Sequence, residues 1–244
     1  MAIRRTRLAA LAVAVLVVIG AALVWGGSRP AGPKPALGLM TSLPIYWPES
    51  LSVNEALDQA AEQHWIRTEL EKTYRLEPLD TLDAAQLRPL KALLLAQPRP
   101  LSPQENVDLD TWVRDGGHLL LFADPFLTEE SRFPLGDKRR PQDVALLSPI
   151  LTRWGLELTF DDRQADGEQA IPFAGTALPV RLGGNWRVIA PGAPASCNVE
   201  ASGVIARCTV GKGRVLAVAD AAVLERNRGT SGAFGELTRQ AFAK

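Results

Sequence analysis

KALLLAQPRPLSPQENVDLDTWVRDGGHLLLFADP, residues 91–125, is the stretch that decides the fold. It contains two apolar runs, Ala92–Ala96 and His118–Ala123, which end at Gln97-Pro98 and at Asp124-Pro125. Short apolar runs with such sharp ends are typical of strands that are buried on both faces of a sheet. The stretch therefore predicts two buried strands.

A helix is expected between these two strands. Ser102 can cap it, Pro103 suits its first turn, and Glu105 can complete a capping box. Gly116-Gly117 can end the helix, because glycine accepts a positive φ. A strand, a helix and a second strand form a βαβ unit, which predicts a parallel sheet.

The rest of the chain extends this pattern. Further strands are expected at residues 36–42, 74–79, 156–160 and 214–219, and helices at 52–73, 81–90, 146–154 and 234–242. Between residues 161 and 210, short β runs alternate with Gly, Pro and Asn, which indicates an antiparallel β extension rather than a second domain. We therefore predict an α/β domain with a mostly parallel, doubly wound sheet and an antiparallel β extension.

The charge composition argues against a nucleic-acid partner. The 244 residues include 27 basic and 27 acidic side chains, so the formal net charge is zero. Nucleic-acid surfaces usually show a basic excess or a basic stripe. With 46% hydrophobic residues, the chain can build a full core.

The N-terminus predicts a membrane anchor. Arg4, Arg5 and Arg7 precede Leu8–Trp25, an apolar run without a charge. Basic residues before such a run favour a cytoplasmic N-terminus. We therefore expect residues 1–7 to be a cytoplasmic tip and residues 8–25 to be a single transmembrane helix.

A Gly/Pro-rich linker, residues 26–35, follows the predicted anchor and leads into the exported domain, residues 36–244. This arrangement predicts a protein of the bacterial inner membrane with a periplasmic C-terminal domain. The alternative is a signal peptide that is cleaved among the small residues at 26–31. No cysteine follows the apolar run, which excludes lipoprotein processing.

Only two cysteines occur, Cys197 and Cys208. The residues between them can form two strands joined by a turn at Ser202-Gly203, which would bring the cysteines together. A disulfide between them suits an exported domain, which meets oxidising conditions. The alternative is that each is a small core residue.

Asp124 and Asp220 are the strongest candidates for a site, because each ends an apolar run. Open α/β sheets bind ligands at the carboxyl ends of their strands. If the two strands are neighbours, both carboxylates face one crevice. Alternatively, each aspartate is the N-cap of a helix that follows it.

Tyr46 and Trp47 form a second candidate, in a proline-bounded loop after the first strand. Aromatic residues there can face a ligand or partner. Alternatively, their rings cover the core.

Motifs of catalysis are scarce. The chain has two histidines, no G-x-S-x-G elbow, no H-E-x-x-H and no paired-cysteine zinc spacing. Gly211-x-Gly213 precedes a strand instead of following one, so it does not indicate a phosphate-binding loop. The sequence predicts no metal site and no cofactor.

Residues 93–125 and GKGRVLAVADAAVLERN at 211–227 carry a resemblance to a known family. They resemble the periplasmic auxiliary domain of gliding-motility-type ABC transport systems and a related membrane-anchored bacterial domain of unknown function. The resemblance covers residues 36–125 and 211–227, and it implies a flavodoxin-like fold of the glutamine-amidotransferase type. In catalytic relatives a cysteine nucleophile follows the strand after the Gly-Gly pair, where this chain has Asp124, so the resemblance implies the scaffold without that chemistry.

These observations predict a membrane-anchored, non-catalytic accessory subunit of a bacterial envelope complex, with ABC permease and ATPase subunits as its partners. The alternative is an extracytoplasmic hydrolase that uses Asp124 and Asp220 with a metal ion or water. A sugar- or peptide-sensing module is a third interpretation, based on Tyr46 and Trp47 alone.

Overall fold

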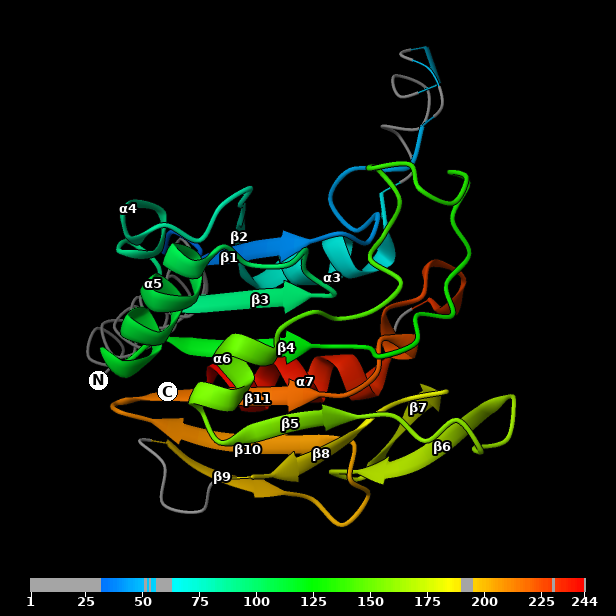
Figure 1. The fold of residues 1–244 in the computed structure, drawn as a ribbon. Coiled ribbons are helices and arrows are strands. Elements are labelled where there is room, and N and C mark those ends of the chain that lie inside the picture. Colours follow the sequence, from blue (N-terminus) through cyan, green and yellow to red (C-terminus); the bar gives the residue numbers. More distant parts are fainter. Residues whose placement is uncertain are drawn as a thin grey trace, which may run out of the picture. The chain divides into compact units, whose positions relative to one another are not determined.

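A seven-stranded sheet runs through the domain that spans Pro35–Lys244 in this computed structural model (Figure 1). The strand order is β2-β1-β3-β4-β11-β10-β9. Five adjacent strands are parallel: β2 (Arg75–Pro78), β1 (Ala36–Thr41), β3 (Ala92–Ala96), β4 (His118–Phe122) and β11 (Gly213–Val218). The antiparallel strands are β10 (Ile205–Val210) and β9 (Ala195–Val199). The predicted α/β class with a mostly parallel sheet is therefore confirmed.

The structure describes residues 32–50, 52, 54–55, 63–189, 195–229 and 231–243. The predicted cytoplasmic tip and membrane anchor, residues 1–25, lie outside these residues, as does most of the predicted linker. Among the helices in the described ranges, none has the length and apolar character needed to span a bilayer.

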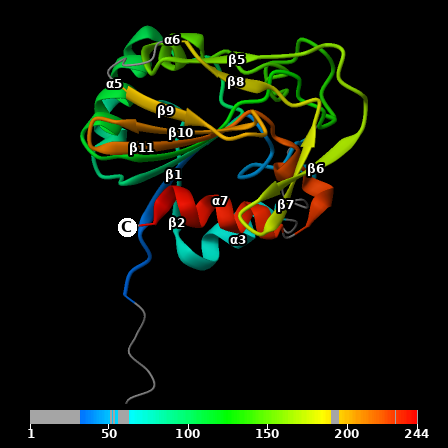
Figure 2. The same cartoon turned by 90° about the horizontal axis from the view of Figure 1, so that it is seen from below.

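Helices lie on both faces of the sheet (Figure 2). One face carries α3 (Trp65–Thr73) and α7 (Gly232–Phe242). The opposite face carries α5 (Pro103–Arg114) and α6 (Ser148–Arg153), and the short α4 (Ala84–Leu87) packs against α5. All five residues of β3 are buried, as expected for a central strand that is covered on both sides.

Two small antiparallel sheets lie outside the main one. They pair β5 (Leu156–Thr159) with β8 (Asn185–Val188), and β6 (Glu168–Phe173) with β7 (Thr176–Arg181). Within the expected β-rich stretch 161–210, the strands that join the main sheet are β9 and β10. After β11 the chain forms two short 3₁₀ turns, η1 (Ala222–Leu224) and η2 (Arg226–Arg228).

The two ends of α5 follow the prediction. The Ser102 side chain accepts a hydrogen bond from the Glu105 backbone N–H, and the Glu105 carboxylate accepts one from the Ser102 backbone N–H, so the capping box is complete. Gly116 has a φ of 109°, a conformation in which a side chain would be strained. Local sequence signals thus determine where this helix begins and ends.

The prediction of one helix over residues 52–73 is wrong at its centre. His64 has extended backbone angles, φ −60° and ψ 136°, and it is the N-cap of α3. Its Nδ1 accepts a hydrogen bond from the Ile66 backbone N–H at 3.3 Å. The apolar spacing continues through His64, but this side-chain cap starts a new helix at Trp65.

Candidate functional site

Buried polar side chains follow three neighbouring parallel strands at their carboxyl ends. Gln97 follows β3, Asp124 lies two residues after β4, and Asp220 lies two residues after β11. Their exposed fractions are 0%, 1% and 1%. The structure thus brings the two predicted aspartates together at one edge of the sheet, but beneath the surface.

All four carboxylate oxygens of the pair accept backbone hydrogen bonds. Asp124 accepts from Phe126 at 2.8 Å and from Ala221 at 3.0 Å. Asp220 accepts from Ala222 at 2.6 Å and from Arg181 at 2.9 Å. The pair therefore joins the end of β7 to the segments that follow β4 and β11.

The close approach of a glycine turn explains why Asp220 is buried. Gly183 lies in the turn between β7 and β8, and a Cβ on it would come within 2.9 Å of the Asp220 Oδ2. A glycine at this position therefore lets the backbone lie directly against the carboxylate.

Burial changes the acidity of both aspartates. Burial raises the pKa of Asp124 to about 6, although hydrogen bonds from Phe126 and Ala221 lower it. Burial is the main reason why the pKa of Asp220 lies well above its ordinary value, and the charge of Asp124 acts in the same direction. Two neighbouring carboxyl groups that are shielded from water cannot both ionise easily. The pair therefore keeps a proton at pH values above those at which exposed aspartates lose theirs.

Neither aspartate is a helix N-cap in the described residues. The Asp220 side chain accepts the Ala222 N–H, but the N-cap of η1 is Ala221, and no side chain caps that turn. No helix begins directly after Asp124. Asp124 instead connects the end of β4 to Ala221, which is 97 positions away in the chain.

Gln97 completes the network, and the sequence analysis missed it. Its side-chain oxygen accepts from the Asp124 backbone N–H at 2.8 Å, and its amide donates to the Asp124 carbonyl at 3.0 Å. The backbone φ of Gln97 is 46°, which is uncommon for a residue other than glycine. The sequence offered one sign of this role, a single amide side chain between the apolar run Ala92–Ala96 and Pro98.

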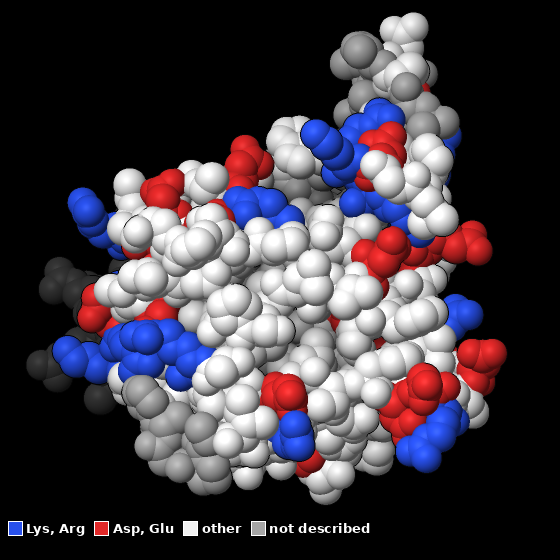
Figure 3. All heavy atoms as spheres, in the orientation of Figure 1, with Lys and Arg blue, Asp and Glu red and all other residues white. Residues whose placement is uncertain are grey.

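A polar pocket of about 470 Å³ opens at this edge of the sheet, and we call it the carboxyl-edge pocket. It is lined by Pro44, Glu49, Thr128–Arg132, Arg181 and Glu225–Asn227. These residues come from the end of β7 and from the segments after β1, β4 and β11. Acidic and basic side chains alternate on this side of the domain, at the right of Figure 3.

Glu129 is the pocket residue with the largest change in acidity. Burial raises its pKa to about 7, and the charges of Glu225 and Glu49 act in the same direction. A hydrogen bond from the Arg226 backbone and the charge of Arg226 oppose this shift. A carboxyl group that titrates near neutral pH in a pocket is a candidate functional group.

Tyr46 and Trp47 lie in the loop that contributes Pro44 and Glu49 to this pocket. The Tyr46 ring is partly buried, with the Arg67 guanidinium 4.2 Å from its centre. Trp47 packs edge-on against Tyr46, with 4.9 Å between ring centres, and is 71% exposed. The Tyr46 ring thus packs against the core, as in the alternative interpretation, while the Trp47 ring is exposed.

Cys197 on β9 and Cys208 on β10 are directly opposite each other and form a disulfide, with 4.1 Å between their Cα atoms.

In the described part of the chain, there is no group of three or more His, Cys, Asp or Glu side chains that could hold a metal ion.

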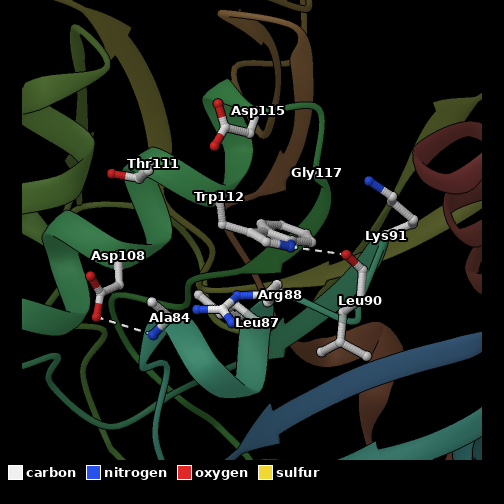
Figure 4. A pocket seen from close by; sticks show the side chains of 10 residues that line it. All are labelled: Ala84, Leu87, Arg88, Leu90, Lys91, Asp108, Thr111, Trp112, Asp115 and Gly117. Atoms are coloured by element: carbon white, nitrogen blue, oxygen red, sulfur yellow. Dashed lines mark hydrogen bonds between the residues drawn. The ribbon is translucent and has the colours of Figure 1, made fainter.

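A second cavity, of about 320 Å³, lies at the opposite edge of the sheet, where β3 and β4 begin (Figure 4). Its walls come from α4, α5 and the residues that precede the two strands, with Leu87, Leu90 and Trp112 as the apolar part. The Trp112 indole N–H donates to the Leu90 carbonyl at 3.1 Å. Gly117 lies against the indole ring.

Replacing Gly117 by alanine is expected to lower the free energy of unfolding by about 1–3 kcal/mol, because the new methyl group overpacks this site. Its Cβ would lie 2.5 Å from two carbon atoms of the Trp112 ring. Urea unfolding of the full chain measures the change. Gly235→Ala is the control, since a Cβ there meets nothing within 4 Å. Equal stability of the two variants would contradict this packing.

Comparison with known proteins gives one family. A sequence model of a family described as "ABC-type uncharacterized transport system" matches residues 34–175, more than half of the chain. The match begins just before β1 and ends in the β6–β7 hairpin, so it includes β4 and Asp124. No curated protein matches the chain.

Several solved structures are distantly similar. Exo-beta-1,4-mannosidase Op5Man5 from Opitutaceae bacterium strain TAV5 shows 13% identity over 78% of this chain and 31% of its own, with a TM-score of 0.44. A putative ThuA-like protein from Bacteroides uniformis shows 9% identity over 88% and 93%, with a TM-score of 0.42. The beta-galactosidase of Bacillus circulans sp. alkalophilus shows 13% identity over 85% and 31%, with a TM-score of 0.44. The chain spans about a third of the length of the two glycosidases, and these distant similarities carry no functional argument.

Proposed function

The chain belongs to the ABC-type uncharacterized transport system family, and from this premise we propose that it is a membrane-anchored, non-catalytic accessory subunit of a bacterial ABC transport system. The family match is the observation that carries the assignment. Permease and ATPase subunits of the same system are the proposed partners, because the matching family is described as an ABC-type transport system.

The state of the aspartate pair supports a binding role over a catalytic one. Asp124 and Asp220 are 1% exposed, and backbone N–H groups occupy all four of their oxygens. A catalytic carboxyl must come within hydrogen-bond reach of its substrate. We therefore propose that the pair stabilises the carboxyl edge of the sheet and that binding takes place at the pocket and at Trp47.

The strand order supports a more specific fold assignment. The parallel strands follow the order β2-β1-β3-β4-β11, which corresponds to the doubly wound order 2-1-3-4-5 of flavodoxin-like folds. We propose that the domain is a flavodoxin-like scaffold of the glutamine-amidotransferase type. At the position where that type has its nucleophile this chain has Asp124 instead of a cysteine.

An extracytoplasmic location is part of the proposal. The charge-free run Leu8–Trp25 after three arginines supports an inner-membrane anchor with the domain in the periplasm. The Cys197–Cys208 disulfide supports an oxidising compartment.

A hydrolase that uses Asp124 and Asp220 is the second candidate. The raised pKa values of the two carboxyls favour it, because paired carboxylates of this kind serve as acid and base in some enzymes. Such an enzyme would require the β7–β8 turn at Gly183 to move away from Asp220.

Photo-crosslinking from position 47 tests the proposed function. A photoreactive phenylalanine analogue that replaces Trp47 in the full chain is expected to form adducts with permease or ATPase subunits in native membranes. Phe160 is the control position, because its ring is also exposed but stacks on Phe126 in another part of the domain. Adducts from neither position, or from position 160 alone, would contradict an accessory role through this loop.

A further inference from the structure

Two of the four acidic residues that line the carboxyl-edge pocket, Glu49 and Glu225, are already supplied with hydrogen-bond donors. Glu49 accepts from the Ser131 hydroxyl at 2.6 Å and from the Arg132 backbone at 2.7 Å. Glu225 accepts from the Thr128 hydroxyl at 3.3 Å and from Arg228 at 3.2 Å. These acidic side chains therefore hold the walls of the pocket together.

Two guanidinium groups in the same pocket are not used in this way. Within the described residues, neither the Arg181 nor the Arg226 guanidinium makes a hydrogen bond or a salt bridge, although both side chains line the pocket. Their backbones are fixed, because the Arg181 N–H donates to Asp220 and the Arg226 N–H donates to Glu129. The charge of Arg181 helps to lower the pKa of Glu168, but the salt bridge of Glu168 is to Arg228.

Two further acidic groups line the pocket, Glu129 and the exposed Glu130, and Glu129 suits a donor role. From the described part of the chain, Glu129 receives one long hydrogen bond, 3.4 Å, from the Arg226 backbone N–H. Because its pKa is raised to about 7, it is protonated over much of the neutral range and can donate its proton in a hydrogen bond.

We propose that the carboxyl-edge pocket binds the carboxylate or phosphate group of a small polar molecule, with Arg181 and Arg226 as the cationic ligands and the Glu129 carboxyl as a further donor. Guanidinium groups match the planar geometry of such oxyanions. A volume of about 470 Å³ lies in the range of small-molecule sites. The inference rests on the proposed function, since it names the ligand class of the binding subunit.

Calorimetric titration of the full chain tests the inference, with inorganic phosphate and succinate as separate probes. Saturable binding of either is expected, and the tighter one identifies the source of the oxyanion. Arg181→Gln and Arg226→Gln are each expected to weaken binding at least about tenfold, since each removes a charge-assisted hydrogen bond. Arg163→Gln is the control, because that arginine is exposed and lies outside the pocket.

The result that would overturn the inference is binding of neither probe, or equal binding by the wild type and both pocket variants. Circular dichroism of each variant separates lost binding from lost folding. The titration needs no transport subunit. Failed anion binding with retained crosslinking from position 47 therefore refutes this inference alone, and the reverse outcome refutes the accessory role alone.

Sulfate tests the role of Glu129 as a hydrogen-bond donor, because the charge of sulfate itself does not change near neutral pH. The charged groups that face Glu129 are Arg226, Glu225 and Glu49. Sulfate binding is expected to strengthen as the pH falls from about 8 to about 6, because Glu129 takes up a proton in that range. Glu129→Gln, which is always neutral, should show a clearly smaller pH dependence, although Asp124 and Asp220, whose pKa values are also raised, still titrate in this variant. A pH dependence that is as large in this variant as in the wild type would contradict a role for Glu129.

Discussion

Replacing Asp124 by alanine is expected to lower the free energy of unfolding by about 2–4 kcal/mol. The change removes the acceptor of two backbone N–H groups, those of Phe126 and Ala221, at a position that is 1% exposed. A buried donor that loses its partner costs about 1–3 kcal/mol, because water cannot replace the lost acceptor. Relief of the repulsion between Asp124 and Asp220 offsets part of this cost. Urea unfolding of the full chain near pH 6 measures the difference.

Asp83 provides a matched control for this variant. Its carboxylate also accepts two backbone hydrogen bonds, from Ala85 and Gln86 at 3.0 Å each, but in an exposed cap of α4. Solvent can take over these bonds, so Asp83→Ala should destabilise the protein much less. If the two variants lose equal stability, the burial of Asp124 does not have the energetic role assigned to it.

The second large effect is a loss of stability at higher pH. The pKa of Asp124 is raised from 3.8 to about 6 in the folded protein, and burial raises that of Asp220 well above its ordinary value. The folded state then binds more protons than the unfolded state over this range, so the free energy of unfolding falls as the pH rises. Glu129, with a pKa of about 7, contributes in the same direction.

His64 has the opposite effect over part of this range. Burial lowers its pKa to about 4, so the neutral folded imidazole costs stability as the pH falls below the ordinary value of 6.5. Because the three acidic groups outweigh one histidine, we expect a net loss of at least about 2 kcal/mol between about pH 5 and about pH 8. Urea unfolding at a series of pH values measures it.

Asp220→Asn is expected to flatten this pH dependence, even if it lowers stability at every pH, because asparagine does not titrate. Asp162→Asn, in the exposed turn after β5, is the control and should keep the slope of the wild type. A slope that is unchanged in Asp220→Asn would show that the buried pair is not its source.

The sequence predicted the parts of the fold that depend on local signals. The strands β3 and β4, the capping box of Ser102 and Glu105, and the end of α5 at Gly116 all follow from residues within a few positions of each other. The order of the apolar runs also placed Asp124 and Asp220 at one edge of the sheet.

Contacts between segments that are far apart in the sequence could not be predicted from such local signals. The burial of Asp220 depends on the turn at Gly183, and the end of β4 is joined to Ala221 by a contact across 97 positions. The carboxyl-edge pocket combines four segments of the chain, so single-sequence patterns did not point to Arg181, Arg226 or Glu129. The His64 side chain caps α3, so a helix begins at Trp65. The regular spacing of apolar residues gave no sign of this cap.

The account depends most on the claim that Asp124 and Asp220 are a buried pair that stabilises the sheet edge and is closed to substrate. Carbon-13 NMR of the aspartate carboxyl groups in the full chain, followed as a function of pH, tests this claim directly. The account predicts that Asp124 titrates near pH 6 and that the pKa of Asp220 also lies well above its ordinary value. Titration of both carboxyls near pH 4, as for exposed aspartates, would contradict it.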